Sequence, residues 1–354
     1  MKFNIVSTCR MGAGTFEAKF KPLSLCKDVD KIVIVRKEPG PAIPKVHYRV
    51  LPKICQNPLM NMLITPFVIM REVKRHNAKF ILAYHYVPHF YLAFIASIFT
   101  GTPYILGQTG SDAEKLVLKP LKGAFLRMVV KKAVFLNVPG NKSLNFWTSI
   151  GFNNVQILHS SIDTDYYVPS EVKKEYDFIY IGRLEGYKGV YRIIEAMKRL
   201  VDKNPALSLA IVGYGSQEDD LKQMAEEYGL ADNISFQGFQ KDTRSWFYKS
   251  RIFVMASDNE GLPCALMEAM SCGLICITSL VGNIADILID GETGFSFQPT
   301  DVDRLCYLME YAFEHQDSLQ EMQTRARDII VKEHSYKASI RLWEIEFAKL
   351  RKVR

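Results

Sequence analysis

The sequence predicts an α/β protein built from two doubly wound parallel sheets. Short apolar runs rich in β-branched residues alternate with helical patterns, and this alternation is typical of parallel sheets. The series begins a second time near the middle of the chain, and 354 residues suffice for two domains. A hydrophobic fraction of 48% and a charged fraction of 23% are ordinary for a globular protein.

The first series of elements is predicted within residues 1–168. A strand at 3–7 leads through the glycine-rich turn MGAGT into a helical stretch, and another helix is expected at 59–76. Further buried strands are predicted at 31–35, 79–84, 104–107 and 134–138. The apolar stretch 80–106 is interrupted by His, Pro and Gly, so it lacks the roughly 18 consecutive apolar residues of a membrane span. We interpret it as a strand, a helix and a further strand.

The second series is predicted within residues 169–334. A strand at 177–181 precedes a helix at 190–200, whose apolar residues recur at helical spacing on one face. Another helix is expected at 217–228, and further strands at 207–212, 234–236, 252–256 and 274–278. The polar, proline-bearing segment PSEVKKEY separates the two series, and a last helix is expected at 335–354.

Charge is distributed unevenly between the two halves. Residues 1–168 carry 22 Lys and Arg against 9 Asp and Glu, a net charge of +13, whereas residues 169–354 carry 23 against 29, a net charge of −6. No acidic residue lies between Glu114 and Asp163, where the cations are Lys115, Lys119, Lys122, Arg127, Lys131, Lys132 and Lys142. Such a half suits phosphates, nucleic acid or an anionic membrane, and a merely solvated basic surface is the alternative. Because Pro120 interrupts the helical pattern, we expect electrostatic attachment rather than helix insertion.

The cysteines and the first residues of the sequence indicate the cellular compartment in which we expect the protein. The seven cysteines are scattered, and no spacing resembles a zinc site, which favours a reducing compartment. The first residues, MKFNIVSTCRMG, contain no apolar segment of the kind found in signal peptides. We therefore expect a cytoplasmic protein, at or near the inner face of the cytoplasmic membrane.

Two cations, Arg183 and Lys188, lie between a predicted strand and the helix that begins after Gly189. The N-terminal end of a helix carries partial positive charge, so cations there are unfavourable unless an anion lies between them. A phosphate group meets that need, because backbone N–H groups and both side chains can bind it. The alternative, to which we give equal weight, is that both side chains simply face solvent in a loop and bind no phosphate.

An unusually apolar helix is predicted between Pro263 and Gly273. Proline suits the first helical position and glycine suits the stop. Apart from Glu268 and Ser271 the residues between them are apolar, which is typical of a buried helix. A buried carboxylate is strongly unfavourable unless it is paired. Glu260 precedes the helix, and Glu268 lies about 7–8 Å beyond its start at 1.5 Å per residue.

The two carboxylates therefore flank an anion site formed by the start of this helix, at residues 261–264. An elongated ligand with a charged middle and hydroxyls at both ends suits that arrangement, and a nucleoside diphosphate sugar has this shape. Carboxylates accept hydrogen bonds from vicinal hydroxyls. We therefore expect Glu268 to bind ribose and Glu260 to bind the sugar. Pairing of Glu268 with a nearby Lys or Arg is the alternative.

The remaining features are weaker evidence for a binding, catalytic or metal site. Gly213 and Gly215 follow a strand and allow a ligand to approach the backbone, although a lone G-x-G is not a dinucleotide fingerprint. Gly14 follows the first strand and suits either such an approach or a plain turn. His85, at the end of a predicted strand, suits catalysis as well as an ordinary half-buried position. Three D-x-D triplets occur, but none follows a convincing central strand, so we assign no metal ion.

Five segments of the second half form an ordered series of short motifs. They are IGRLEGYKG, IVGYGS, ISFQGF, NEGLPCALMEAMSCG and DGETGF. In this order they resemble the motifs of the retaining glycosyltransferases of family 4, and the two glutamates of the fourth segment have the family's E-x7-E spacing. The first half resembles the family more loosely, through AYHYVPHFYLAFIASIFTGTPYILGQTGSD and SSIDTDYY.

The resemblance implies the GT-B fold, in which two Rossmann-like domains face a cleft. The acceptor-side domain would span residues 1–168 and the nucleotide-sugar-binding domain residues 169–334. The C-terminal helix, 335–354, would return to pack on the first domain. The implied reaction is a retaining transfer that needs no metal and no cofactor besides the nucleotide sugar.

The resemblance also implies roles for single residues. Arg183 and Lys188 would hold the diphosphate and stabilise the leaving group, and Glu268 would bind ribose. Glu260, with the backbone of the next three residues, would hold sugar hydroxyls and a phosphate, and Gly14 would let the diphosphate approach the first domain. Further donor contacts are expected at Gly182, Gly213, Gly215, Phe239, Gly261, Leu262, Pro263 and Cys264.

The first domain departs from the family pattern at one position. Many members have a histidine near the reacting sugar, and Thr109 takes that place here. Either His85 or Gln108 contributes instead, or the sugar differs there. Among these we assign His85 to the catalytic set.

The leading interpretation is a hexosyl- or N-acetylhexosaminyl-type glycosyltransferase that uses a nucleoside diphosphate sugar, by default that of UDP. Its acceptor would be a glycan or lipid-linked molecule of surface polysaccharide, glycolipid or lipid-linked glycan biosynthesis, reached by peripheral contact with an anionic membrane. We expect no nucleic acid partner. A nucleotide-sugar epimerase of the same fold and a non-catalytic sugar-nucleotide-binding module remain as alternatives.

Overall fold

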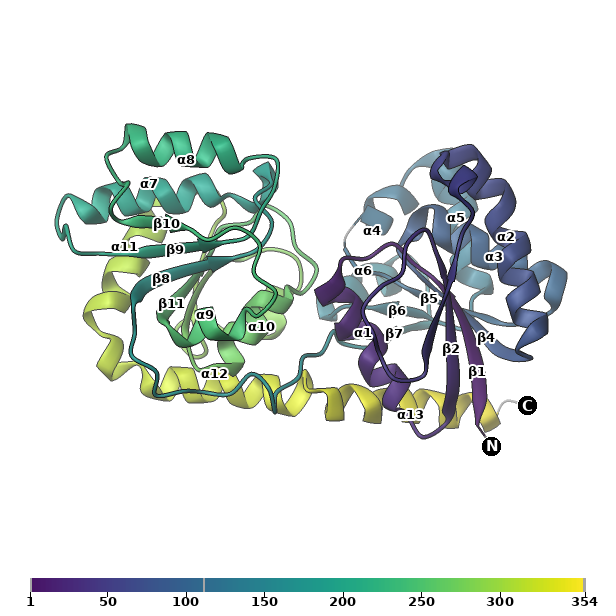
Figure 1. Cartoon of the computed structure of the whole chain (residues 1–354). Helices are drawn as coiled ribbons and strands as arrows, with labels where there is room; N and C mark the ends of the chain where they lie inside the picture. Colours follow the sequence, from purple (N-terminus) through teal and green to yellow (C-terminus); the bar gives the residue numbers. More distant parts are fainter. Residues whose placement is uncertain (1, 111, 353–354) are drawn as a thin grey trace. The chain divides into compact units, whose positions relative to one another are not determined.

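The computed structural model describes residues 2–110 and 112–352 and divides the chain into two compact units (Figure 1). The first unit runs to Ser161 and includes the segment from Tyr336 onward, and the second is Ile162–Ser335. The division falls before the predicted boundary at residue 168. The reason is that Ile162 forms a parallel bridge with Ser335, and the carbonyl oxygen of Tyr167 accepts a hydrogen bond from Arg327, so this segment is bonded to the second unit.

Seven parallel strands form the sheet of the first unit within the described residues, in the order β3-β2-β1-β4-β5-β6-β7. The strands are β1 (Phe3–Thr8), β2 (Val29–Arg36), β3 (Val46–Val50), β4 (Ala78–Tyr84), β5 (Tyr104–Gly107), β6 (Leu136–Val138) and β7 (Val155–Ile157). The two strands that the sequence did not predict, β3 and β7, are the two edges. Edge strands are less buried, so their apolar signal is weak.

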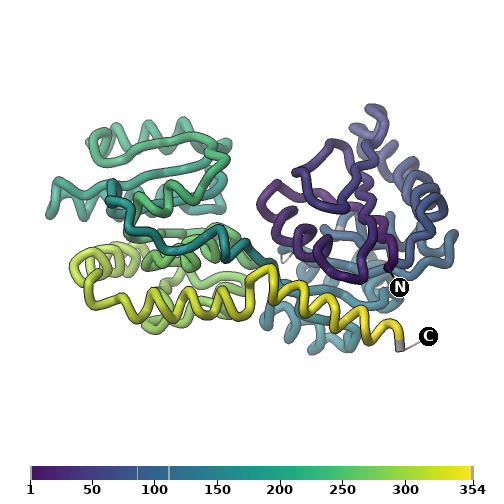
Figure 2. The backbone as a smooth tube through the Cα atoms, turned by 60° about the horizontal axis from the view of Figure 1, so that its bottom comes forward, coloured from purple at the N-terminus to yellow at the C-terminus, as the bar shows by residue number. Residues whose placement is uncertain are grey.

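Helices cover both faces of this sheet. They are α1 (Ala13–Leu25), α2 (Pro58–Arg75), α3 (Tyr91–Thr100), α4 (Asp112–Val117), α5 (Pro120–Lys132), α6 (Asn141–Ser149) and α13 (Tyr336–Lys352), with short turns η1 (Lys53–Gln56) and η2 (Tyr86–Phe90). Helices α2 to α6 share one core with the sheet. Helices α1 and α13 cover the other face and lie side by side although they are far apart in sequence (Figure 2). The helical pattern is interrupted at Pro120 as predicted: α4 ends at Val117, and Pro120 begins α5, because the first helical position needs no N–H.

No helix in the described ranges 2–110 and 112–352 is both long enough and apolar enough to span a membrane.

Six parallel strands, all within the described residues, form the second sheet in the order β10-β9-β8-β11-β12-β13. They are β8 (Tyr176–Ile181), β9 (Leu209–Val212), β10 (Ile234–Phe236), β11 (Ser250–Met255), β12 (Ile275–Ser279) and β13 (Phe295–Phe297). The helices are α7 (Val190–Val201), α8 (Glu218–Glu227), α9 (Arg244–Tyr248), α10 (Cys264–Ser271), α11 (Val302–Glu314) and α12 (Gln320–Glu333), with turns η3 (Gly186–Lys188), η4 (Ile284–Asp286) and η5 (Gln316–Ser318).

Each face of the second sheet is again covered. Helices α7, α8 and α11 share a core on one face, and α9, α10 and α12 share a core on the other. The predicted fold class, two doubly wound parallel sheets, is therefore confirmed. In both sheets the strand order reverses beside the first strand of the unit. In open α/β sheets such a switch point brings the loops at the carboxyl ends of the strands together, and ligands bind there.

Candidate active site

The loops after β8 and β9 pack backbone against backbone at the carboxyl edge of the second sheet. The N–H of Gly182 donates to the carbonyl oxygen of Val212 at 3.0 Å, and the N–H of Leu184 donates to that of Tyr214 at 2.9 Å. Gly213 has a φ of 149°, and a Cβ there would lie 1.8 Å from the carbonyl oxygen of Gly182. Glycine is therefore required at this position to bring the two loops together.

Lys188 and Glu260 form an ion pair between the loop after β8 and the loop after β11. The Lys188 Nζ lies 2.5 Å from the Glu260 Oε1, and the two side chains are only 15% and 10% exposed. Gly189 follows with a φ of 63°, and a Cβ there would lie 2.1 Å from the carbonyl oxygen of Ala256. The close contact between the backbones of Gly189 and Ala256 thus holds Lys188 beside the loop after β11. This loop carries Glu260 and leads into α10.

Arg183 is the exposed cation of the same loop. Its guanidinium donates a hydrogen bond to the hydroxyl of Tyr187. The Tyr187 ring lies against both cations, 5.7 Å from the Arg183 Cζ and 5.4 Å from the Lys188 Nζ. The sequence predicted two equivalent cations around an anion. Instead Arg183 faces solvent, while Lys188 is already paired with Glu260 and binds an anion only if that pair is shared or opened.

Helix α10 begins beside this ion pair. Its first residue is Cys264, one position later than predicted, and Pro263 occupies the cap. Proline has no side chain that bonds the N–H groups of the first turn, so this end suits an anion. Gly273 follows the helix with a φ of 77°, which confirms the predicted stop. The loop after β12 holds the backbone of Gly261 in place, because the N–H of Asn283 donates a hydrogen bond to the carbonyl oxygen of Gly261 at 2.9 Å.

Glu268 is half-buried rather than fully buried, which corrects the prediction from the apolar helix. Thr243 donates a hydrogen bond to its Oε2 at 3.4 Å, and the hydroxyls of Thr243 and Tyr167 lie 3.0 Å apart. Burial, followed by the negative charge of Glu268, raises the pKa of Tyr167 and raises that of Cys272 to about 12. Both groups therefore stay protonated at neutral pH.

Two aromatic side chains stand exposed after β9 and β10. Phe239 and Tyr214 are 68% and 57% exposed, and their rings meet edge to face with centroids 5.6 Å apart. Phe239 was predicted as a donor contact. The side chain of Tyr214 was not, although it lies between the two glycines of IVGYGS. A flat π-surface of this kind suits a base.

The second unit thus joins most of the predicted donor residues within loops that touch one another. The Lys188–Glu260 pair, the Gly182–Gly213 contact and the Gly261–Asn283 hydrogen bond connect the loops after β8, β9, β11 and β12. Sequence reasoning missed Tyr187 and Thr243, which contact the predicted residues directly. Tyr187 could have been found, because it stands beside Lys188 in IGRLEGYKG. Thr243 belongs to no motif.

In the first unit, His85 lies directly after β4 with a φ of 74°, an uncommon conformation for a residue other than glycine. It is half-buried, and burial lowers its pKa, which nearby Asp112 partly offsets. His89 is buried, its Nδ1 lies 2.8 Å from the Thr8 Oγ1, and burial lowers its pKa to about 3. Both imidazoles are therefore neutral at pH 7, and His85 is the more exposed of the two.

Gln108 is bound within the fold. Its Oε1 accepts from the indole of Trp147 at 2.7 Å, and its Nε2 donates to Glu114 at 2.5 Å. Since the side chain is 2% exposed, it does not replace the family's histidine at a ligand surface. Gly14 lies exposed in the first turn of α1, and a Cβ there would meet no atom within 4 Å. The first unit itself thus does not require glycine at this position.

Residues 164–329, which nearly coincide with the second unit, match the family model "Glycosyl transferases group 1". The chain is 24% identical over 276 residues to N-acetyl-alpha-D-glucosaminyl L-malate synthase of Bacillus anthracis, covering 74% of this chain and 72% of that protein. It is also 29% identical over 171 residues to the putative colanic acid biosynthesis glycosyltransferase WcaL of Salmonella typhimurium, covering 46% of this chain but only 42% of that protein.

The fold is similar to that of Anabaena HepE, solved in complex with UDP and glucose, with a TM-score of 0.80. That alignment covers 98% of this chain and 99% of the other at 14% identity, so it shows the fold alone. The chain as a whole therefore has the GT-B fold. Its second unit, rather than the whole chain, matches the group 1 glycosyl transferases.

Proposed function

We propose that this protein is a retaining, metal-independent glycosyltransferase that moves a hexosyl or N-acetylhexosaminyl group from a nucleoside diphosphate sugar to an acceptor. The observation that carries the proposal is the Lys188–Glu260 ion pair, with exposed Arg183 held against the Tyr187 ring that also contacts Lys188. It supports the proposal because two cations and a carboxylate lie in contacting loops whose motifs resemble those of the family's donor site. UDP is the proposed nucleotide, because HepE was solved with UDP.

The proposed chemistry uses the charges of this chain. As the sugar–phosphate bond breaks, negative charge develops on the diphosphate, and preorganised cations and backbone N–H groups stabilise such charge without reorganisation. Arg183 would bind the diphosphate from solvent. Lys188 would turn from Glu260 to the phosphate, which frees Glu260 for the sugar hydroxyls. Glu268 would bind ribose, with Phe239 and Tyr214 against the base, while His85 would act at the acceptor side in the first unit.

The proposed setting is the synthesis of surface polysaccharide, glycolipid or lipid-linked glycan at the inner face of the cytoplasmic membrane. The seven cysteines are all free, which is consistent with a reducing compartment. The cations between residues 115 and 142 are all exposed and would attract anionic lipid. No nucleic acid is proposed as a partner, since the basic residues lie in the unit that would receive a lipid-linked acceptor.

The test starts from the donor. Thermal-shift measurements with the UDP, GDP and ADP sugars should identify one donor that raises the melting temperature. With that donor, free nucleoside diphosphate should be released only when a glycan or lipid-linked acceptor fraction is added, and EDTA should leave the rate unchanged. Product release without acceptor would favour the epimerase alternative. Binding without turnover under any acceptor would favour the non-catalytic module.

A further inference from the structure

Helix α2 buries an apolar side, with Ile69 and Val73 in the core, and also leaves several large apolar side chains exposed. Asn61, Thr65 and Glu72 are buried, and Thr65 donates to Asn61 at 2.7 Å. Leu63 and Phe67, on the outer side, are 53% and 68% exposed. Exposed apolar side chains that continue along a helix beside its buried face favour contact with a partner outside the chain.

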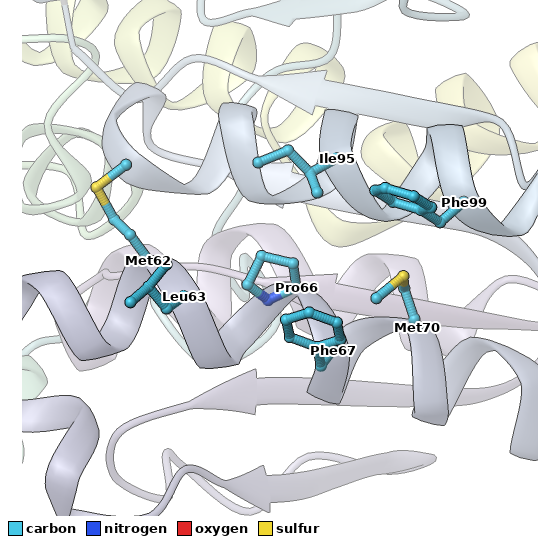
Figure 3. Close-up of a pocket in the computed structure, with 7 residues that line it drawn as sticks. All are labelled: Met62, Leu63, Pro66, Phe67, Met70, Ile95 and Phe99. Atoms are coloured by element: carbon cyan, nitrogen blue, oxygen red, sulfur yellow. The ribbon is translucent and has the colours of Figure 1, made fainter.

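The exposed face of α2 continues onto α3 as an apolar groove (Figure 3). Its volume is about 240 Å³, and the lining residues are Met62, Leu63, Pro66, Phe67 and Met70 of α2 with Ile95 and Phe99 of α3. Phe99 is 70% exposed. No charged residue occurs in 58–70 or in 80–111, so the sequence contributes no charge to either wall.

Helix α5 packs on the same core as α2 and α3, contacts α3 and carries exposed cations. The Tyr91 and Phe125 rings stack at 5.0 Å and join α3 to α5, and both helices share the core layer of α2. On α5, Leu121 is 88% exposed. The exposed cations on and around α4 and α5 are Lys115, Lys119, Lys122, Arg127, Lys131 and Lys132. Glu114 bonds inward to Gln108, so among the described residues of this stretch the negative charge at the surface is that of Asp112.

Exposed apolar side chains with cations nearby fit an anionic bilayer better than a second copy of this chain. Large exposed apolar patches mark interfaces with protein or membrane. A symmetric pairing of two copies would bring the two sets of cations against each other, which is unfavourable. An anionic bilayer offers acyl chains to the apolar residues and negative headgroups to the cations, and it repels neither.

We infer that the outer face of α2, α3 and α5 inserts Phe67, Phe99 and Leu121 into the acyl region of an anionic bilayer, with the surrounding lysines on the headgroups. This deepens the membrane contact proposed above: attachment is partly hydrophobic and not only electrostatic. The transfer reaction is not needed for it. Vesicle binding without donor therefore tests this inference, whereas donor binding without vesicles tests the function.

The depth of insertion can be measured with an introduced tryptophan. Phe99→Trp places an indole on the face, and Tyr307→Trp is the control, because Tyr307 is 52% exposed on α11 in the second unit. The vesicles contain phosphatidylglycerol and phosphatidylcholine, with or without brominated acyl chains. The added emission of Phe99→Trp should shift to the blue and be quenched by the brominated lipid, and that of Tyr307→Trp should not. Equal responses of the two variants would overturn the inference.

The hydrophobic and electrostatic contributions to membrane binding can be separated by co-sedimentation with the same vesicles at two salt concentrations. Salt weakens only the electrostatic contribution, because the screening length falls from about 10 Å at 0.1 M to about 3 Å at 1 M salt. The wild type should keep a bound fraction at 1 M. The triple variant Phe67→Ser, Phe99→Ser, Leu121→Ser should lose about tenfold or more of its partition there, since burying one such side chain is worth about that factor. The control triple, Val172→Ser, Ile289→Ser and Val331→Ser, changes side chains of 41–44% exposure in the second unit and should bind as the wild type does.

Neutralising Lys119, Lys122 and Lys131 to Gln should weaken binding at 0.1 M salt and leave the fraction bound at 1 M unchanged. Melting curves of every variant check that folding is intact. The inference is overturned if the wild type ignores anionic vesicles at both salt concentrations. It is also overturned if the wild type sediments as a dimer without lipid and the apolar triple variant as a monomer, because the face would then join two copies of this chain.

Discussion

At the scale of the residue, Lys188 has a partner before any ligand arrives. Removing it leaves the carboxylate of Glu260, 10% exposed, without its cation. Lys188→Ala should therefore lower the free energy of unfolding by about 1–3 kcal/mol, the range for hydrogen bonds to charged groups, besides lowering turnover. Arg183→Ala should leave stability within about 0.5 kcal/mol, because the side chain is exposed, yet lower turnover by about 10²–10³.

Urea unfolding beside steady-state kinetics measures both effects. The double variant Lys188→Ala, Glu260→Ala is the control, since it removes the uncompensated charge and should regain part of the lost stability without regaining activity. Equal stability of Lys188→Ala and Arg183→Ala would contradict the assigned ion pair.

Glu268 is accessible enough to bind a ligand and receives a hydrogen bond from Thr243. If it binds ribose, Glu268→Gln should weaken the nucleoside monophosphate and diphosphate by the same factor, about 10-fold or more, because both contain the ribose. Calorimetric titration of both nucleotides checks this, with Thr243→Val as the control for a change in the hydrogen-bonded cluster alone. Unchanged affinity with a lowered melting temperature would assign Glu268 to structure.

His89 makes the first unit sensitive to acid. Its pKa falls from about 6.5 in the unfolded chain to about 3 in the fold, so the unfolded state binds more protons between these values. The contribution of His89 is thus complete above pH 6.5 and is lost as pH falls toward 3, by up to about 1.4 kcal/mol per pH unit. His89→Asn, which keeps a partner for Thr8, should flatten the dependence of unfolding free energy on pH between 6 and 4. The exposed His47→Asn should not, and equal slopes in the two variants would refute the assignment.

At the scale of the element, glycine decides how the loops after β8 and β9 meet. Gly213→Ala would place a Cβ 1.8 Å from a carbonyl oxygen at a φ of 149°, so it should lower the free energy of unfolding by about 3 kcal/mol or more. It should also abolish nucleotide binding. Gly186→Ala, in the same region, meets no atom within 4 Å and should change stability by less than about 1 kcal/mol. Urea denaturation of both variants measures this, and similar losses would contradict the loop geometry.

The elements also show how far the sequence could be interpreted. The central strands were predictable because burial on both faces makes them continuously apolar. The edge strand β3 was not, since most of its residues are partly or fully exposed. Helix α2 was predicted, but not which of its apolar residues stay exposed, because apolar residues occur on more than one side of this helix. The interruption at Pro120 was predictable, since proline cannot continue a helix but can begin the next one.

At the scale of the whole molecule, the repeated strand–helix series correctly predicted two parallel-sheet domains, and several of the ordered motifs lie in loops that contact one another in the second unit. What the sequence did not show is pairing across loops. Lys188 and Glu260 are 72 residues apart, and nothing in either motif indicates that they bond to each other. The substitution at Thr109 predicted a departure in the first unit, yet the inward bonding of Gln108 became evident only from the structure.

The central claim is that the second unit binds a diphosphate beside Arg183. The most direct test is calorimetric titration of UDP and UMP, with GDP and ADP beside them, into the wild type and Arg183→Ala. The account predicts that the wild type binds one diphosphate about tenfold or more tightly than its monophosphate, since a charge-assisted hydrogen bond is worth about this factor. It also predicts that Arg183→Ala loses this preference and still binds the monophosphate. The account would be contradicted if the wild type bound none of the diphosphates, or if the variant kept the full preference.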